Sequence, residues 1–234
     1  MQKLKAELHC HASEDPYDRL DYSAKELLDM LAMEGFEVVA LTLHGSQHYP
    51  EDLKQYADER GILLIPGVEA FIGKKHTLLY NFDYHPRTIR TFDDIRRHKR
   101  SDSLVIAPHP YYPDSSCLWS DLDRHADIFD AIEYCHFHSH GFNFFNRLAV
   151  KKAKALGLPV VGTSDIHTIG QIGQTYSILE AEKSITGVID AVKKKRVEVV
   201  SNPLSVTTLL RTTGAVMAEK TRRLICGGLA PPIA

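Results

Sequence analysis

ELHCHASEDPYD, residues 7 to 18, places two histidines and four carboxylates in a segment with the pattern of a first β-strand and the loop that follows it. The strand begins in the run LKAEL, residues 4–8, and continues into HCH. A strand that is buried in a protein core normally excludes charged side chains. We therefore interpret this stretch as a strand whose end delivers functional side chains to a site.

The same combination of an apolar run and a polar end recurs along the chain. Apolar runs occupy residues 4–8, 37–43, 62–68, 77–82, 103–108, 128–134 and 158–163. Amphipathic segments lie between them; residues 23–35 carry the capping-box signature Ser23 and Glu26, and residues 142–157 end at a glycine. Seven such strand–helix units without a linker predict a single α/β barrel over residues 1–203, with a doubly wound open sheet as the alternative.

The end of the chain adds less regular features. Two short runs, residues 176–179 and 197–200, flank a helix led by Ser184. Residues 204–225 form a last amphipathic stretch before a loose tail. We expect residues 204–234 to form a helix and tail that pack on the barrel.

The composition is that of an ordinary soluble globular protein, with 44% hydrophobic and 25% charged residues. A formal net charge of -2 gives no bulk attraction to nucleic acid or an anionic membrane. We interpret the basic runs at residues 95–100, 151–154 and 193–196 as solvated faces. Four distant cysteines without a CxxC pair argue against disulfides, and no apolar run is long enough to span a membrane, so we expect a cytoplasmic protein.

Metal-ligating side chains gather where the predicted strands end or begin. His9 and His11 are two residues apart on a strand, so their side chains point to the same side. Other strand ends supply His44, Glu69, His76, His109, Asp165 and His167, and the loop after the first strand supplies Asp15, with Glu14 and Asp18 as rivals. A barrel brings these ends together, and only a bound cation relieves the conflict among converging carboxylates and imidazoles. The pattern predicts a site for divalent metal ions.

The motifs ELHCH, LTLH, PGVE, APHP and GTSDIH, together with the histidine of KKHTLL, resemble the polymerase and histidinol phosphatase (PHP) superfamily over residues 4–203. The resemblance implies a distorted seven-stranded, TIM-like (β/α)7 barrel that binds two or three divalent metals. It assigns the first metal to His9, His11, Glu69 and Asp165, the second to Glu69, His76 and His109, and the third to Asp15, His44 and His167. In place of the family's usual aspartate before the second motif's histidine, this chain has Leu43.

Ligation by histidine and carboxylate without thiolate suits zinc, manganese or iron. The resemblance implies a metal-dependent phosphoesterase that attacks a phosphomonoester or nucleotide-type small substrate with a hydroxide held by the metals. We expect Glu69, Asp165, His109 and His138 to be catalytic. The alternatives are a nuclease or exonuclease that acts on short nucleic acid, a metal-dependent amidohydrolase, and a non-catalytic metal-stabilised module that binds a partner.

The predicted barrel mouth carries further candidates for contacts with substrate. His136, His138 and His140 alternate after the sixth predicted strand and so lie on one side. Lys74, Lys75 and Arg147 are cations that could hold a second phosphate, and Tyr111 and Tyr112 could stack on a base. Apart from a small phosphorylated substrate we expect no membrane partner, and nucleic acid only as a substrate.

Overall fold

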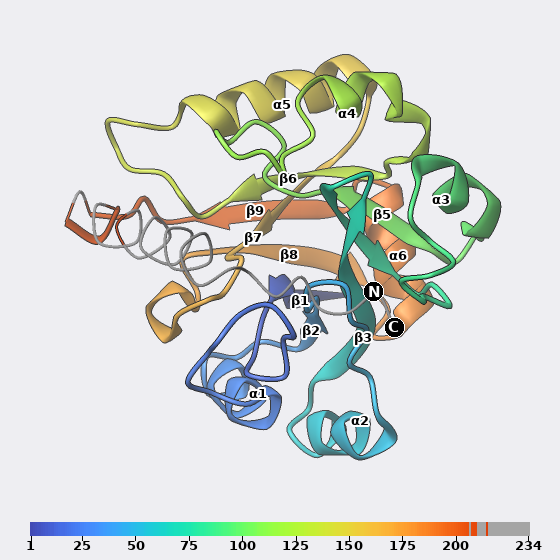
Figure 1. Ribbon diagram of the computed structural model, residues 1–234. Helices are drawn as coiled ribbons and strands as arrows, with labels where there is room; N and C mark the ends of the chain where they lie inside the picture. The colour runs from blue at the N-terminus through green and yellow to red at the C-terminus, as the bar shows by residue number, and fades with distance from the viewer. Residues whose placement is uncertain (206, 210–213, 215–234) are drawn as a thin grey trace.

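The structure is a computed structural model that describes residues 1–205, 207–209 and 214 (Figure 1). Most of the predicted helix at residues 204–225 and the tail after it lie outside these residues, as does Cys226. The predicted division at residue 203 therefore stays a prediction.

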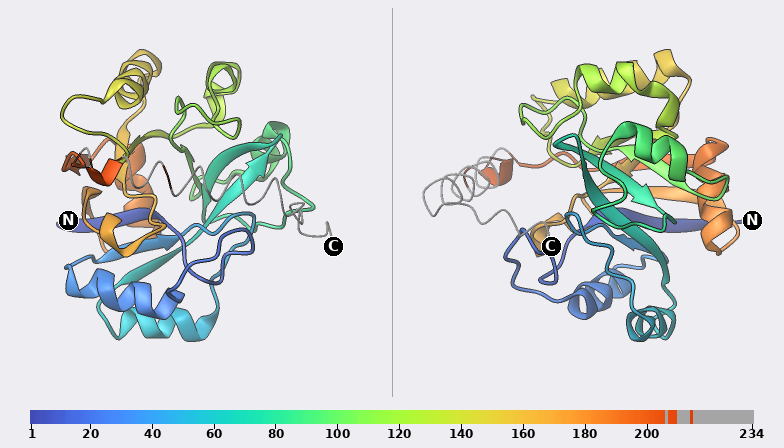
Figure 2. Two further views of the ribbon diagram at one scale, coloured as in Figure 1. Left: turned by 60° about the vertical axis from the view of Figure 1, so that its left-hand side comes forward. Right: turned by 45° about the vertical axis from the view of Figure 1, so that its right-hand side comes forward.

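Nine strands form one sheet in the order β7-β6-β5-β4-β3-β2-β1-β8-β9. Their bounds are Gln2–Cys10 (β1), Val38–Leu41 (β2), Leu63–Ile72 (β3), Lys75–Tyr80 (β4), Leu104–Ala107 (β5), Ala131–Cys135 (β6), Val160–Thr163 (β7), Thr175–Ala181 (β8) and Val197–Ser201 (β9). The sheet curls into a nearly closed barrel (Figures 1 and 2). The predicted barrel fold is confirmed, but it has nine strands where seven were expected.

The two additional strands come from the short runs at the end of the chain. β8 pairs antiparallel with β1, and β9 pairs antiparallel with β8. β4 is also antiparallel to both of its neighbours, because the tight turn after Ile72 reverses the chain. The barrel is therefore mixed, and His76 lies at the beginning of its strand beside the end of β3, opposite Phe71.

β7 closes the barrel against β8 through a glycine. A Cβ atom at Gly162 would lie 2.7 Å from the carbonyl oxygen of Tyr176 in β8 and 2.8 Å from a methyl group of Val199 in β9. The Gly162 N–H instead donates a hydrogen bond to Ser177 Oγ at 3.0 Å, and Ser177 Oγ donates to the Gly162 carbonyl at 2.9 Å. Only glycine permits this close approach of backbones.

Helices cover the barrel on two sides and at one end (Figure 2). α1 (Ala24–Met33) and α2 (Glu51–Asp58) lie on one side, and α4 (Ser120–Arg124) and α5 (Phe144–Leu156) on the other. α1 begins with the predicted capping box of Ser23 and Glu26. The remaining helices are α3 (Phe92–His98), α6 (Ile185–Lys193) and the 3-10 turns η1 (Ala126–Ile128) and η2 (Ile169–Gln171).

α6 closes the end of the barrel at which β1 begins. Val188, Ile189 and Val192 are buried and pack with Leu4 of β1 and Leu104 of β5 in one apolar cluster. Burial of such side chains is the main stabilising contribution to a core of this kind. The opposite end of the barrel carries the polar residues that the sequence singled out.

Candidate metal centre

All the predicted ligands except Asp15 fall into groups whose donor atoms lie within 4.8 Å of one another. The groups are His9, Glu69 and His109; His9, His11 and Asp165; His44, Glu69 and His76; and His11, Asp18, His44 and His167. They come from β1, β3, β4 and the loops after β1, β2, β5 and β7. Because these segments meet at one end of the barrel, residues spread over most of the chain form a single cluster.

Glu69 is the centre of the cluster and is 1% exposed. Its Oε2 lies 3.3 Å from His9 Nε2 and 3.0 Å from His44 Nε2. Its Oε1 lies 2.6 Å from His76 Nδ1 and 3.3 Å from His109 Nε2. The carboxylate thus faces imidazoles from four segments, and its two oxygens face different pairs of histidines.

Asp165 lies beside the two histidines at the end of the first strand. Its Oδ1 lies 3.2 Å from His9 Nε2 and 3.5 Å from His11 Nε2. The ends of β1 and β7 are held together by backbone hydrogen bonds, since the Ile166 N–H donates to the His9 carbonyl at 3.2 Å and the His11 N–H donates to the Ile166 carbonyl at 3.1 Å. This pairing fixes the HxH strand and Asp165 beside each other.

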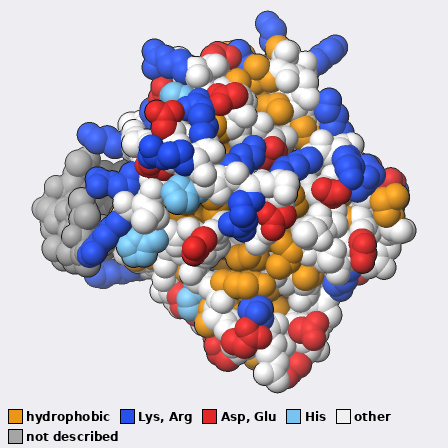
Figure 3. All heavy atoms as spheres, turned by 90° about the vertical axis from the view of Figure 1, so that its right-hand side faces the viewer, with side chains coloured by type: hydrophobic (Ala, Val, Ile, Leu, Met, Phe, Trp, Pro, Cys, Tyr) orange, Lys and Arg blue, Asp and Glu red, His pale blue; other side chains and the backbone are white. Residues whose placement is uncertain are grey.

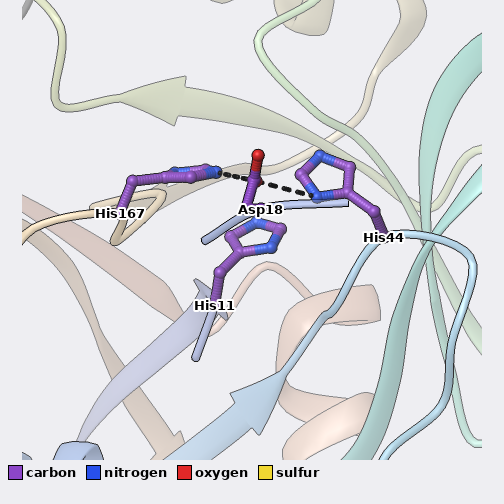
Figure 4. A group of neighbouring side chains, drawn as sticks. All are labelled: His11, Asp18, His44 and His167. Carbon is purple, nitrogen blue, oxygen red and sulfur yellow. Dashed lines mark hydrogen bonds and ion pairs between the residues drawn. The ribbon is translucent and has the colours of Figure 1, made fainter. Parts of the chain in front are cut away.

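The outer group joins the loop after β1 to histidines from three other segments (Figure 4). Asp18 Oδ2 lies 3.0 Å from His167 Nε2 and 3.2 Å from His44 Nδ1. The ring of His11 stacks on that of His167 with centroids 4.2 Å apart. Figure 4 shows the Asp18 carboxylate between the rings of His167 and His44.

Asp15 lies behind this group and orients two of its members. Its Oδ2 accepts hydrogen bonds from His11 Nδ1 at 2.9 Å, from the His44 N–H at 2.9 Å and from His44 Nδ1 at 3.0 Å. A carboxylate that holds the far nitrogen of an imidazole fixes the tautomer that presents the other nitrogen to a metal. We infer that Asp18, rather than Asp15, is the loop ligand, and that Glu14 caps α1 through the Ala24 N–H.

Asp18→Asn is expected to lower the number of metal ions bound, whereas Asp15→Asn is expected to lower only the affinity for metal. Asp18→Asn removes a ligand, so elemental analysis after dialysis should show about one equivalent less metal than the wild type. Asp15→Asn removes an orienting partner, so the stoichiometry at saturating metal should persist with an affinity about 10–100-fold weaker. If Asp15→Asn loses the equivalent and Asp18→Asn keeps it, Asp15 is the ligand.

The unsatisfied polar atoms of the cluster fit a cation. His9 Nε2, His11 Nε2, His76 Nδ1 and Asp165 Oδ1 are buried and have no hydrogen-bond partner among the described residues. For His76 Nδ1 this holds although Glu69 Oε1 is near, because the two groups are not aligned for a hydrogen bond. Buried polar atoms in proteins are normally paired, and bound divalent metals would satisfy all four.

The ionisation of the carboxyl groups supports the same conclusion. Burial alone would raise the pKa of Glu69, but the imidazoles of His76, His44 and His9 hold it well below its ordinary value. The pKa of Asp165 is lowered in the same way against the effect of burial, chiefly by His9 and His167. Both carboxyl groups are therefore anionic at neutral pH, the state in which a carboxylate can bind a metal.

Two buried carboxyl groups support the ligands from below. Glu133 of β6 accepts hydrogen bonds from His9 Nδ1 at 2.7 Å and from the His109 N–H at 2.6 Å, and also from the Thr163 hydroxyl. Glu7 accepts from the N–H groups of His9 and Ser164. Burial raises the pKa of Glu7 to about 8, so it is mainly neutral at pH 7 and adds little negative charge.

Gln171 organises the loop that carries Asp165 and His167. Its Oε1 accepts hydrogen bonds from the N–H groups of His167 at 2.8 Å and Thr168 at 2.6 Å. Its Nε2 donates to the Asp165 carbonyl at 3.2 Å and to His136 Nε2 at 2.7 Å. Burial lowers the pKa of His136 to about 4, so this ring is neutral and can accept that bond.

Other predicted candidates lie outside the cluster. His138 Nε2 is 2.7 Å from Ser201 Oγ in β9, and none of the groups found among the described residues includes His138 or His140. Lys75 Nζ donates to the carbonyls of Ser115 and Cys117 at 2.9 Å. Tyr112 donates from its hydroxyl to the Phe137 carbonyl, so its ring covers the loop after β6. Among the described residues, no hydrogen bond or ring contact joins these side chains to the side chains of the ligand groups, although the Tyr112 N–H donates to the His109 carbonyl at 3.3 Å.

Several contributors were not found by sequence reasoning. Glu133, Glu7 and Gln171 were missed, and Asp18 was held only as a rival to Asp15. Glu133 carried a usable signal, since it is a carboxylate inside the apolar run at residues 128–134. A buried charge in a strand requires partners, and here the partners are the ligands and their backbone.

Comparisons with known proteins place this geometry in context. The family model described as PHP-associated matches residues 143–197. An uncharacterized protein of Methanocaldococcus jannaschii is 28% identical over 163 residues, which cover 64% of this chain and 91% of that protein. A two-domain protein of Bacteroides vulgatus that contains a predicted PHP-like metal-dependent phosphoesterase is 21% identical, with a TM-score of 0.70, over 90% of this chain and 68% of that one.

A nucleic-acid enzyme shares the fold as well. The lesion-specific endonuclease Q of Pyrococcus furiosus is 14% identical, with a TM-score of 0.57, over 85% of this chain and 58% of that one. These likenesses confirm the resemblance to the PHP superfamily that the motifs indicated: the chain has the fold of PHP-like metal-dependent phosphoesterases. Among the described residues there is no helix with the length and apolar character needed to span a membrane.

Proposed function

We propose that this chain is a metal-dependent phosphoric ester hydrolase whose centre is the cluster around Glu69. The observation that carries the proposal is the convergence of two groups on this one carboxylate, with Asp165 beside them and four buried donor atoms unsatisfied. Bound divalent metals would supply an activated water and would neutralise the charge of a phosphate in such a site. We propose zinc, manganese or iron as the metal, in two or three positions.

The chain's own residues would act by binding and orientation. Glu69 and the HxH pair are buried at the bottom of the site, where electrostatic interactions are strong. The side chains of Asp165 and His167 are 19% and 34% exposed, so substrate would approach the cluster from their side. We propose Glu69, Asp165 and His109 as the residues on which hydrolysis depends, and we do not extend this role to His138, because its imidazole is bonded to Ser201.

The substrate proposed from the sequence is a phosphomonoester or a nucleotide-type molecule. The open approach beside His167 supports a small or extended phosphate ester. The likeness to endonuclease Q supports the second candidate, a nuclease that acts on short nucleic acid. That enzyme has the same fold at low sequence identity, and its substrate is a nucleic acid.

Hydrolysis of chromogenic esters tests the proposal. Protein purified without chelator is assayed on p-nitrophenyl phosphate and bis(p-nitrophenyl) phosphate with and without added Mn²⁺, and its metal content is measured. We expect metal-stimulated turnover that Asp165→Asn lowers by at least about 10²-fold. Asp83→Asn, at an exposed position after β4, is the matched control and should keep full activity. The proposal is contradicted if the purified protein contains no metal and hydrolyses neither ester even after Mn²⁺ is added.

Removal of metal is expected to destabilise the fold. Without cations the carboxylates and imidazoles of the centre face one another unsatisfied, and metal that binds only the folded state adds to its stability. At a metal concentration 100 times the dissociation constant the melting temperature should exceed that of chelated protein by about 5–10 °C. Differential scanning calorimetry with EDTA, and with EDTA followed by excess Mn²⁺, measures the shift and its reversal; an unchanged melting temperature would show that no metal is bound.

A further inference from the structure

The outer face of α5 carries three cations in a row. Arg147, Lys151 and Lys154 are exposed, and their spacing of four and three residues places them on one side of the helix. None of their side chains has a hydrogen bond or ion pair with a described residue. No acidic residue occurs between Glu133 and Asp165 in the sequence, so the whole segment around α5 is cationic.

This row differs from the other cationic regions of the protein. Many cations elsewhere are paired with carboxylates, as in Lys25–Asp52 and Lys99–Asp130, whereas these three lie unpaired along one face of a helix. On the side of the molecule that carries α3 and α6, at the right of Figure 1, Lys and Arg side chains are interspersed with Asp and Glu (Figure 3). Neutralised pairs exert little field on a distant anion, whereas an unpaired row does.

The row begins at the end of the barrel that carries the metal centre. The side chain of Asn146, in the first turn of α5, is bonded to both backbone groups of Cys135 at the end of β6, at 3.0 and 2.8 Å. The next residue, His136, contacts the loop of Asp165 through Gln171. The first turn of α5 thus lies at the barrel mouth, and the helix leads away from it (Figure 1).

Aromatic rings stand exposed at this end of the helix. Phe144 is 56% exposed and Phe142 is 44% exposed. Both rings pack against the ring of Phe145, with distances between ring centroids of 5.5 Å for Phe144 and 5.6 Å for Phe142. The Phe145 ring packs in turn against that of Tyr112, with a centroid distance of 4.9 Å. The exposed rings are therefore held by packed neighbours and offer flat apolar surfaces next to the cations.

A hollow lies beside the row on the side of α4. It measures about 320 Å³ and is lined by Tyr111, Asp123, Leu148, Lys151, Lys152 and Ala155. The Tyr111 hydroxyl is buried and has no hydrogen-bond partner among the described residues. Lys152 is paired with Asp123 at 2.6 Å, which leaves Lys151 as the free cation at this hollow. Lys151 therefore adds an unpaired positive charge to the wall of this hollow.

We infer that the outer face of α5, from Phe144 through Arg147 and Lys151 to Lys154, binds single-stranded nucleic acid and leads it to the metal centre. The inference rests on the proposed function for its substrate class, because it assumes that the phosphate ester cleaved at the mouth belongs to the bound strand. Surfaces that bind single strands combine a cationic track for the backbone with aromatic rings on which bases stack, and this face has both.

The geometry favours a single strand over other polyanions. The ligands at the bottom of the centre are buried, so a flexible single strand can bring a phosphodiester to them more easily than a stiff duplex can. Exposed phenylalanine rings can stack only on bases that are not already stacked in a helix. A membrane surface would use the cations but would not explain rings placed at the mouth of a metal site.

Fluorescence anisotropy of the full chain with a labelled single-stranded DNA of about 12 nucleotides tests the inference. The strand is checked for integrity on a denaturing gel, so binding is scored independently of hydrolysis. We expect Arg147→Ala/Lys151→Ala/Lys154→Ala to weaken binding at least about tenfold and to make the slope of log K against log salt shallower by about 2. Phe144→Ala alone should weaken binding about tenfold.

The matched control replaces Lys3, Lys183 and Lys193 by alanine at the α6 end of the barrel, which removes the same charge and should leave affinity and slope unchanged. The inference is overturned if the α5 triple variant binds like the wild type, if the control loses as much affinity, or if duplex DNA or phosphatidylserine vesicles bind as tightly as the single strand. A different result is that the protein lacks phosphoesterase activity while the α5 variants still weaken its binding of single-stranded DNA. That result would refute the proposed function but would leave the inferred binding surface intact.

Discussion

Glu69→Gln is expected to remove two metal sites at once and to lower phosphate ester hydrolysis by at least about 10³-fold. Glu69 belongs to the group with His9 and His109 and to the group with His44 and His76. A glutamine keeps the shape of the side chain but offers only one oxygen, which is neutral. Its NH₂ group cannot bind a metal and would face imidazole nitrogens whose lone pairs are needed for metal binding. No other described carboxylate is within reach of both groups, so no neighbour can replace it.

Elemental analysis and turnover measured on the same preparation check this prediction. Glu180→Gln is the matched control, because Glu180 also lies on a strand but is exposed and distant from the mouth. It should keep the metal content and activity of the wild type. If Glu69→Gln retains the full metal content, Glu69 does not bridge metals, and the assignment of the two inner groups must be revised.

The barrel could be predicted from the sequence because its signal is periodic. Short apolar runs alternate with amphipathic segments, and the predicted runs coincide with β1 to β9 to within a few residues. The number of strands was harder to predict, because β8 and β9 have burial patterns that alternate or are half-exposed and resemble ordinary surface strands. Whether such strands join a sheet depends on tertiary pairing with β1, which local sequence does not encode.

The inner ligands were predictable for a related reason. A ligand at a strand end is placed by the strand itself, so Glu69 and His9 could be assigned to the barrel mouth before the structure was known. The loop after β1 has no such constraint: its turn brings Asp15 under His11 and carries Asp18 to His167. Three carboxylates within one loop cannot be ranked without that turn.

Backbone strain at two ligands was also beyond sequence reasoning. His109 and Asp165 have φ angles of 25° and 47°, which side-chain-bearing residues rarely adopt. Such conformations persist only where surrounding contacts hold them. For His109 that contact is Glu133, whose Oε2 accepts the backbone N–H at 2.6 Å. The same carboxylate orients His9, so one buried residue supports ligands from β1 and from the loop after β5.

Glu133→Gln is therefore expected to weaken metal binding about 10–100-fold although Glu133 contacts no metal. All three of its partners donate, namely His9 Nδ1–H, the His109 N–H and the Thr163 hydroxyl. A glutamine must turn its NH₂ group toward at least one donor. If that donor is His9, the ring is driven to the tautomer with a proton on Nε2, and this nitrogen can no longer bind a metal.

Glu133→Ala should destabilise the protein more than Glu133→Gln does, because it leaves the buried donors without any partner. We expect it to lower the free energy of unfolding by about 3–5 kcal/mol. Metal titration of Glu133→Gln separates orientation from stability, since a purely structural role would lower the melting temperature of the chelated protein and leave the metal dissociation constant unchanged. Glu198→Gln, on the exposed side of β9, is the control. An unchanged dissociation constant in Glu133→Gln would mean that the pairing of β1 with the end of β7 suffices to orient His9.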